Sequence, residues 1–322
     1  MIDLSTEYAG LKLRNPLIAA SSGLTNSFHK IKQLEKAGVG AVVLKSLFEE
    51  QIDSHSEKLS LTSDYPEAGD YIDAYVEMNH VGKYLDLIKD AKASCNIPII
   101  ASINCYKVSR WIDFAKSIEE AGADALELNV FLINTGEYGD RYLEESYIKI
   151  VRELKKVIRI PLIIKMARTV SNLPGLVEKL KAMGVNAVVL FNRFYQLDID
   201  TMEITSGPVF SHPADFSETL RWTAIASGYV PDFDIACSYG VHKHGDIVKG
   251  ILAGATAMQL CSVWYEEGMG IVPEMLVFLE EWMSQNNYET LDQFRGKLNY
   301  SNIPSPALYE RAQFMKYFSN HK

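Results

Sequence analysis

The sequence predicts a single α/β domain, a (β/α)8 or TIM barrel, and two observations lead to it. The first is a phrase that occurs four times: a helix end, a glycine, a tight turn and an apolar strand. The copies read AGVGAVVL (37–44), AGADALEL (121–128), MGVNAVVL (183–190) and AGATAMQL (253–260). The glycine suits the left-handed cap that ends many helices. Strands that are apolar on both faces belong to parallel sheets covered by helices.

The second observation is that more strands and helices alternate between these copies. Strand patterns occur at 17–20, 97–103, 160–166 and 233–236, and two of them open with Ile-Pro, which the first residue of a strand accepts. Apolar residues at helical spacing fill the gaps. Eight strands alternating with helices over roughly 250 residues are typical of the barrel. A doubly wound open sheet is the alternative, and the lack of GxGxxG after the first strand disfavours it.

The domain organisation follows from the same pass along the chain. No linker rich in Gly, Pro or Ser is visible, so we expect one barrel domain over 1–298 and a helical extension over 299–322. Apolar residues at helical spacing predict an amphipathic helix in this extension, buried on the barrel or on a second subunit. They are Leu308, Tyr309, Ala312, Met315 and Phe318.

Two connections are longer than a barrel needs, 46–80 and 191–216. Both follow strands, at the end of the barrel where enzymes of this fold keep their chemistry. We expect both to be loops that carry function or cover a site.

Composition limits the kinds of partner. With 322 residues, 48% hydrophobic residues and a net charge of −9, the chain can bury a large core but does not suit nucleic acid or an anionic membrane. The 4 cysteines show no CxxC spacing, so we expect free thiols in a reducing cytoplasm. No signal peptide and no apolar run of about 20 residues is visible. The expected partner is a small-molecule substrate, with a homodimer left open.

Polar residues follow the apolar strands where each strand ends, and we expect them to converge at one mouth of the barrel. Any one Asn or Ser, taken alone, is better explained as a solvated strand end. Lys45 and Lys165 are less easily explained so, because lysines deep in a protein are rare unless paired. They suit an anionic ligand, or a ring that becomes anionic on reduction. The full set is Ser21, Ser22, Gly23, Lys45, Ser46, Asn104, Cys105, Asn129, Lys165, Asn192, Ser238, Tyr239, Gly240, Cys261 and Ser262.

Barrels often bind a phosphate between the turns that follow the seventh and eighth strands. Gly240, Cys261 and Ser262 lie at those turns, although a second glycine would make the turn roomier. His242 and His244 follow, but at a helix start they are better explained as a solvated cap than as metal ligands, so no metal is expected.

At these residues the chain resembles the dihydroorotate dehydrogenase family, over about 4–298. The opening GLKLRNP (10–16) resembles the family's N-terminal hairpin, and Lys45-Ser46 its Lys-Ser pair beside the flavin. ELN (127–129) followed by Asn134 is similar to its Glu-Leu-Asn-x-Ser-Cys-Pro-Asn motif. Lys165 matches a flavin-contacting lysine and Asn192 a substrate-contacting asparagine. GATAMQL (254–260) and FRGKL (294–298) are close to the closing signatures.

The resemblance implies a bound FMN and an oxidoreductase that acts on the CH–CH bond of dihydroorotate or a related acid in pyrimidine biosynthesis. Lys165 would then stabilise negative charge on the reduced ring. The implied cofactor residues are Ser21, Ser22, Gly23, Lys45, Ser46, Asn104, Asn129, Lys165, Asn192, Gly240, Cys261 and Ser262. The implied substrate residues are Lys45, Asn79, Asn129, Asn134, Asn192 and Arg193.

Departures from the family pattern leave alternatives open. Leu132 stands where the family has its Cys or Ser base, with Thr135, Tyr138 and Cys105 as the nearest substitutes. Tyr239 replaces the first glycine of the phosphate turn. The alternative is therefore a barrel that binds FMN or a metabolite but has lost dihydroorotate oxidation. A barrel that binds only a protein partner is a third reading, and a tRNA-modifying flavin barrel would need a basic face.

Overall fold

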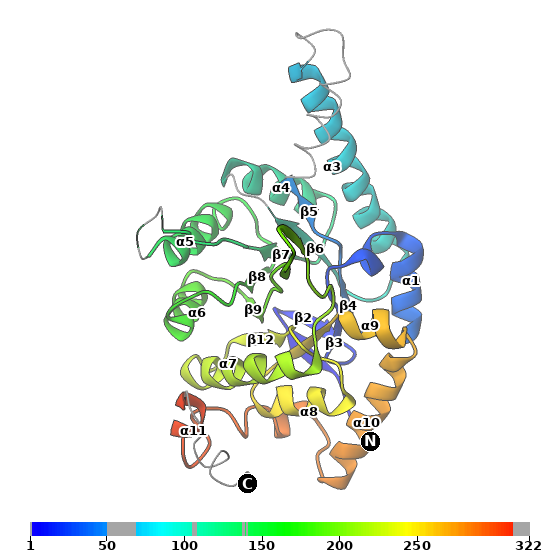
Figure 1. Ribbon diagram of the computed structural model, residues 1–322. Coiled ribbons are helices and arrows are strands. Elements are labelled where there is room, and N and C mark those ends of the chain that lie inside the picture. Colours follow the sequence, from blue (N-terminus) through cyan, green and yellow to red (C-terminus); the bar gives the residue numbers. More distant parts are fainter. Residues whose placement is uncertain (1, 50–68, 105–107, 137–138, 140, 312–322) are drawn as a thin grey trace.

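The computed structural model describes residues 2–49, 69–104, 108–136, 139 and 141–311, with only the backbone for 69–78, 108 and 109. Within these residues, eight parallel strands close into a barrel (Figure 1), as predicted. Pairing of β13 with β3 and of β4 with β6 completes the ring. The barrel strands are β3 (Leu17–Ala19), β4 (Ala41–Val43), β6 (Ile99–Asn104), β7 (Ala125–Asn129), β8 (Leu162–Met166), β9 (Ala187–Leu190), β12 (Asp234–Cys237) and β13 (Ala257–Leu260).

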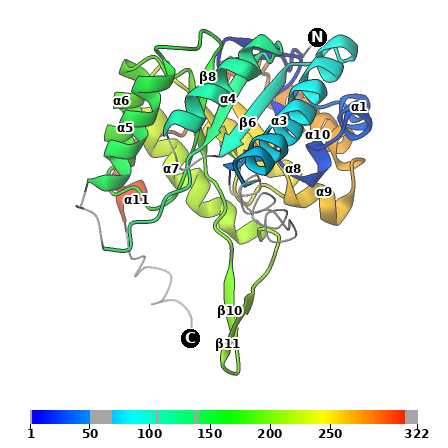
Figure 2. The ribbon, with the colours of Figure 1, turned by 90° about the horizontal axis from the view of Figure 1, so that it is seen from above.

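Helices between the strands and after the last one cover the outside of the barrel (Figures 1 and 2). They are α1 (Phe28–Ala37), α3 (Gly69–Ser94), α4 (Val108–Glu120), α5 (Tyr142–Leu154), α6 (Leu173–Ala182), α7 (Phe216–Tyr229), α8 (His244–Leu252), α9 (Ser262–Glu267) and α10 (Ile271–Gln285). A short α11 (Ala307–Glu310) follows, and the 3-10 turns are η1 (Gly23–Thr25), η3 (Pro213–Asp215) and η4 (Leu291–Gln293). None of the described helices is long and apolar enough to cross a membrane.

The expected N-terminal hairpin is present as β1 (Thr6–Tyr8) and β2 (Leu11–Leu13), paired antiparallel. Tyr8 and Leu13 are buried in the same cluster as the small and branched side chains that face the inside of the barrel. The hairpin therefore plugs the amino-terminal end of the barrel and leaves the carboxyl-terminal end for a site.

The inside of the barrel changes from apolar to polar along each strand, because side chains alternate between its two faces. In β8, Ile163 belongs to the buried apolar cluster inside the barrel, and Lys165, two residues later, faces the same way. In β7, the side chains of Glu127 and Asn129 lie on the same face of the strand as Ala125, which belongs to that apolar cluster. A polar layer therefore lies directly on an apolar one.

The connection over 191–216 differs from the expected loop, because it contains a second hairpin. Strands β10 (Leu197–Asp200) and β11 (Glu203–Ser206) pair antiparallel and project from the body of the molecule (Figure 2). The pattern was missed because the apolar side chains of this hairpin are exposed, so no core marks them. Of the other long connection, 46–80, the described part holds β5 (Leu47–Phe48), which pairs with β6, and the start of α3.

Two smaller expectations were wrong. The Ile-Pro pairs lie just before β6 and β8 rather than inside them. In the extension, Leu308 is 51% exposed instead of buried. The remainder of that stripe, 312–322, lies outside the described residues.

Candidate active site at the barrel mouth

A cavity of about 610 Å³ opens at the carboxyl ends of the barrel strands. Its size suits a small-molecule or cofactor site. The predicted residues that line it are Ser21, Ser22, Asn104, Asn129, Lys165, Asn192, Arg193, Ser238, Tyr239, Cys261 and Ser262. They come from loops and strands far apart in the sequence, and the closed parallel barrel is what brings them together.

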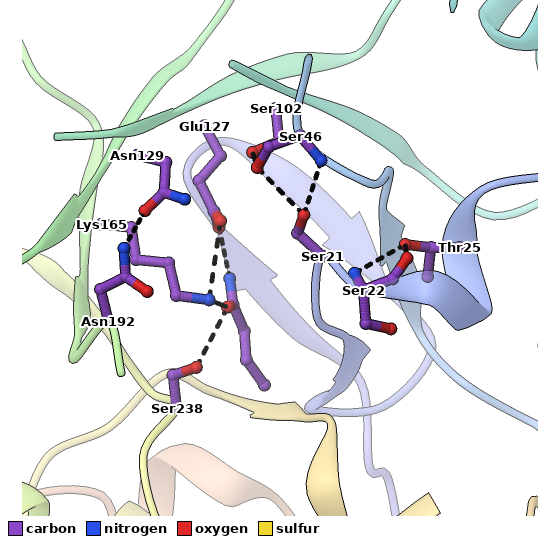
Figure 3. Close-up of polar contacts among 11 residues, drawn as sticks. Ser21, Ser22, Thr25, Ser46, Ser102, Glu127, Asn129, Lys165, Asn192 and Ser238 are labelled. Atoms are coloured by element: carbon purple, nitrogen blue, oxygen red, sulfur yellow. Dashed lines mark hydrogen bonds and ion pairs between the residues drawn. The ribbon is translucent and has the colours of Figure 1, made fainter. Parts of the chain in front are cut away.

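Lys165 lies at the floor of this cavity and is held by two neighbours. Its Nζ donates to Gln259 Oε1 at 2.9 Å and lies 3.9 Å from Glu127 Oε1. Gln259 Nε2 in turn donates to Glu127, and Ser238 Oγ lies 3.4 Å from Gln259 Oε1 (Figure 3). The lysine is thus 7% exposed yet paired, as a buried cation requires.

Burial raises the pKa of Glu127, and the nearby Lys165 ammonium and the hydrogen bond from Gln259 oppose that rise. Burial also raises the pKa of the Cys261 thiol, which lines the cavity, again against the influence of Lys165. Among the described residues that line the cavity, Lys165 and Arg193 are cations and none is a carboxylate. The electrostatic field in the cavity therefore favours an anionic ligand.

Short polar side chains form two clusters beside the lysine. Asn192 Nδ2 donates to Asn129 Oδ1, which joins the ends of β9 and β7. On the opposite wall, Ser21 Oγ accepts from the backbone N–H of Ser46 at 2.8 Å, and Ser46 Oγ lies 2.7 Å from Ser102 Oγ (Figure 3). Ser46 is therefore a buried support for Ser21 rather than part of the lining.

The turns after β12 and β13 meet at one end of the cavity. Gly240 has φ +82°, and a Cβ there would lie 2.2 Å from the backbone N of Phe216, so the turn requires glycine. Ser262 Oγ accepts from the N–H of Ser211 at 3.0 Å. Ser211 Oγ lies 2.9 Å from His242 Nε2.

His242 and His244 contact different carboxylates, so the structure does not pair them as metal ligands. His242 Nδ1 lies 3.1 Å from Glu266 Oε2, whereas His244 Nε2 lies 3.6 Å from Glu274 Oε2. The described residues contain no group of three or more side chains suited to a metal ion.

Other predicted residues are not part of the cavity lining. Lys45 is half-buried, and Asn79 is exposed on α3. Asn134 supports a local turn, where its Oδ1 accepts from the N–H of Gly136 at 3.0 Å. Gly23 lies in η1, where a Cβ would come within 3.0 Å of Tyr265 Oη.

The position of the family's base was singled out from the sequence, and its surroundings are apolar. Leu132 is half-buried, packs against the core and is absent from the lining, whereas its neighbour Phe131 lines the cavity. Phe131 packs against Phe194, with ring centroids 4.6 Å apart. Thr135 is exposed, and Tyr138 and Cys105 lie outside the described residues.

Sequence reasoning missed two kinds of site residue. Glu127 and Gln259 support Lys165, and a sequence signal existed: each is a polar residue inside an otherwise apolar strand phrase. The aromatic wall had no such signal, because several of its members come from the segment around the β10–β11 hairpin. The aromatic lining residues that the sequence did not single out are Phe48, Phe131, Phe191, Phe194, Tyr195, Phe210 and Tyr265, and the predicted Tyr239 completes the wall.

Comparison with known proteins agrees with this geometry. The family model described as dihydroorotate dehydrogenase matches residues 3–283. A dihydroorotate dehydrogenase B (NAD(+)) catalytic subunit of Thermoplasma volcanium is 28% identical, covering 92% of this chain and 98% of that protein. A protein of the same name from Thermoplasma acidophilum is 26% identical, covering 92% and 99%. A putative dihydroorotate dehydrogenase A (fumarate) of Aeropyrum pernix is 24% identical, covering 91% and 97%. The family match covers most of the chain, and the chain therefore belongs to the dihydroorotate dehydrogenase family.

Proposed function

We propose that this chain is an FMN-dependent oxidoreductase that acts on a CH–CH bond of dihydroorotate or a related acid. The observation that carries the proposal is the cavity with Lys165 at its floor, Arg193 in its wall and no carboxylate among its described lining residues. Such a site suits a ring that gains negative charge on reduction together with an anionic phosphate. The relatives are named for dihydroorotate, so it is the first substrate to test.

The residues present fit FMN. Bound FMN would supply the redox chemistry, and the protein would orient it and set its electrostatics. Lys165 would stand against the part of the ring where negative charge develops. At the turn beside Gly240, Ser262 Oγ accepts from both the N–H and the hydroxyl of Ser211, so its own hydroxyl hydrogen is left to donate to one phosphate. The aromatic wall would exclude water from the reacting face.

Substrate binding falls to the amide pair of Asn129 and Asn192 and to the guanidinium of Arg193. The amides present donors and acceptors that match the polar edge of a planar substrate. Arg193 lines the cavity while its Nη1 and Nη2 donate to the carbonyls of Val209 and Pro208, and its positive charge, which no carboxylate of the described lining balances, would attract an acid. Lys45, Asn79 and Asn134 lie outside the cavity lining, so they would contribute only if the segments that carry them move toward the substrate.

A second candidate function is a flavin- or metabolite-binding barrel that no longer oxidises dihydroorotate. Leu132 at the base position favours it, because oxidation of a CH–CH bond must also remove a proton. No Asp, Glu or His is among the described lining residues, and the pKa of Cys261 is raised. A general base contributes on the order of 10²–10⁴-fold, so its loss is decisive for this reaction.

Acid release and chromatography of the purified protein test the cofactor. We expect FMN, because no dinucleotide fingerprint is present in the sequence. Recovery of FAD, or of no flavin after reconstitution with FMN, would contradict the proposal.

Anaerobic stopped-flow reduction then decides between the two candidates. We expect dithionite to reduce the flavin readily and dihydroorotate to reduce it far more slowly than the roughly 1–10³ s⁻¹ of ordinary enzymes. Fast bleaching by dihydroorotate would show that another group removes the proton. A panel of related acids identifies the substrate if dihydroorotate fails, and Leu132→Cys is the matched variant that restores the thiol.

A further inference from the structure

Glu127 and Lys165 form a buried charge pair below the cavity, and binding of a cofactor does not by itself require the carboxylate of this pair. Glu127 is fully buried and does not line the cavity, so it cannot contact a ligand there. Its Oε1 nevertheless lies 3.9 Å from Lys165 Nζ, which does line the cavity. A buried carboxylate is costly, and a barrel core could be filled by apolar side chains instead.

The side-chain amide of Gln259 connects the two charged groups through hydrogen bonds that run in one direction. Gln259 Nε2 donates to Glu127 Oε2, so the Gln259 side-chain oxygen must point the other way, toward Lys165. Only an ionised Glu127 accepts without donating. Gln259 therefore bridges the two charged groups, with its oxygen on the ammonium and its Nε2 on the carboxyl group.

One carboxylate oxygen of Glu127 is also free to take a proton. Its Oε1 has no hydrogen-bond partner among the described residues. Titratable groups that face it are Lys165 from β8, Tyr84 from α3 and Tyr8 from β1, and Glu127 contributes to the raised pKa of both tyrosines. The amide of Gln259 faces it from β13. Tyr84 Oη is occupied, since it donates to the carbonyl of Ser102 and accepts from the same residue's N–H.

We propose that Glu127 is a proton-accepting counter-ion for Lys165, a positioning residue that acts through that lysine. While the cavity holds no negative charge at Lys165, ionised Glu127 balances the ammonium. When negative charge forms at Lys165, Glu127 takes one proton from solvent and becomes a neutral acid, so the ammonium balances the new charge alone. This inference rests on the proposed flavin function, because reduction of the ring supplies that negative charge.

The physical reason is that three charges cannot all be accommodated in a buried site with one cation. Two anions that share one cation repel each other, and burial already raises the pKa of Glu127, so a second anion at Lys165 favours protonation of this carboxylate further. Removing the carboxylate should therefore make the cavity more receptive to negative charge.

A redox titration at several pH values tests the proton step. Compared with the native protein, Glu127→Gln should have a higher reduction potential at neutral pH and a shallower dependence of that potential on pH. Infrared difference spectra of native protein should gain a protonated-carboxyl band on reduction, and the variant should lack it. Asp234→Asn is the matched control, because Asp234 is a half-buried carboxyl with a raised pKa at the amino end of the barrel. Unchanged slopes and no band would overturn the proposal.

If Glu127→Gln does not fold, Gln259→Met removes the bridge at similar volume and should shift the potential in the same direction. An unshifted potential in a folded Gln259→Met protein would equally contradict the role of the bridge.

A double-mutant cycle tests the pair without any flavin. In flavin-free protein, Lys165→Met removes the counter-ion of Glu127, so the melting temperature should fall strongly at high pH, where the carboxyl group must ionise, and less at low pH, where it stays protonated. Adding Glu127→Gln should recover much of that loss, whereas additive losses would overturn the coupling. A protein that never binds flavin would overturn the proposed function and the proton step together, and the cycle would still decide whether Glu127 is the counter-ion.

Discussion

At the scale of single residues, the backbone at the end of the cavity where the turns after β12 and β13 meet depends on one glycine. Gly240 combines a positive φ with a close approach to the start of α7, and each of these alone disfavours a side chain. The family pattern has a glycine just before it in this turn, and here Tyr239 replaces that glycine. The ring of Tyr239 lies under the Arg168 guanidinium at 4.8 Å, which fixes that side chain in the wall.

Gly240→Ala should therefore destabilise the protein by more than about 2 kcal/mol and abolish FMN retention. Gly122→Ala is the matched control, because Gly122 has φ +91° but nothing within 4 Å of its would-be Cβ. It should cost only about 1–2 kcal/mol, the strain of a Cβ at positive φ without a clash. Chemical denaturation measures both, and equal losses would show that the contact with Phe216 is unimportant.

A second prediction at this scale concerns Cys237 in β12. Burial raises the pKa of its thiol to about 12, against the hydrogen bond with Thr223. Because the thiolate is the reactive form, about one molecule in ten thousand is reactive at pH 8. Iodoacetamide at pH 8 should label Cys95, which is half-buried, much faster than Cys237, which reacts only after unfolding. Peptide mass spectrometry checks this, and similar rates in the folded protein would refute it.

At the scale of elements, the β10–β11 hairpin combines an exposed arm with an anchored base. Its partners Ile199 and Ile204 are 75% and 74% exposed, so packing contributes little to its stability. The base is fixed by Arg193, whose guanidinium donates at 2.6 Å to the carbonyls of both Pro208 and Val209. Arg193 and Val209 also line the cavity, so the arm and the site share an anchor.

Arg193→Ala should loosen the base of the arm and weaken FMN retention without a large fall in melting temperature. Two charge-assisted hydrogen bonds are lost at a partly exposed site. This should lower the local stability of the β10–β11 hairpin by roughly 1–3 kcal/mol and leave the stability of the barrel unchanged. Hydrogen exchange of amides in 196–207 should accelerate. Arg193→Lys keeps the charge but not the paired donors, so it should restore only part of the protection. Unchanged exchange in both variants would remove Arg193 from the anchor.

At the scale of the whole molecule, the strands close the barrel, and the segment after α10 packs against the helices on its outer surface. The N–H of Leu298 donates to the carbonyl of Leu252 at 2.8 Å, and that of Tyr300 to Ala224 at 2.9 Å. The ring of Tyr300 packs against Tyr229 on α7, with centroids 4.9 Å apart. A Cβ on Gly228 would lie 2.8 Å from Tyr300 Cβ, so this contact is tight.

We propose on this ground that 299–322 is an extension of the barrel domain and not a separate unit. Truncation after Leu298 should lower the melting temperature by several degrees, corresponding to about 1–2 kcal/mol for a protein of this size. Tyr300→Ala in the full chain should reproduce most of the loss. Differential scanning calorimetry measures both, and an unchanged melting temperature on truncation would show a free appendage.

The sequence by itself determined the barrel. Four copies of one helix-glycine-strand phrase, with strands apolar on both faces, allow few alternatives to a closed parallel sheet. It also determined which end of the barrel is polar, since Asn129, Lys165 and Asn192 follow apolar runs. Those inferences succeeded because they depend on local spacing and on the alternation of side chains along a strand.

Only the tertiary structure decided which polar residues share a site and in what state. Lys165 and Gln259 are 94 residues apart, and Glu127 and Gln259 are 132 apart, so no local pattern pairs them. It also removed Lys45 and Asn79 from the cavity lining and supplied an aromatic wall through the β10–β11 segment. Burial, and with it the pKa of Glu127, is a property of the closed barrel, because desolvation depends on every element that packs around the carboxyl group.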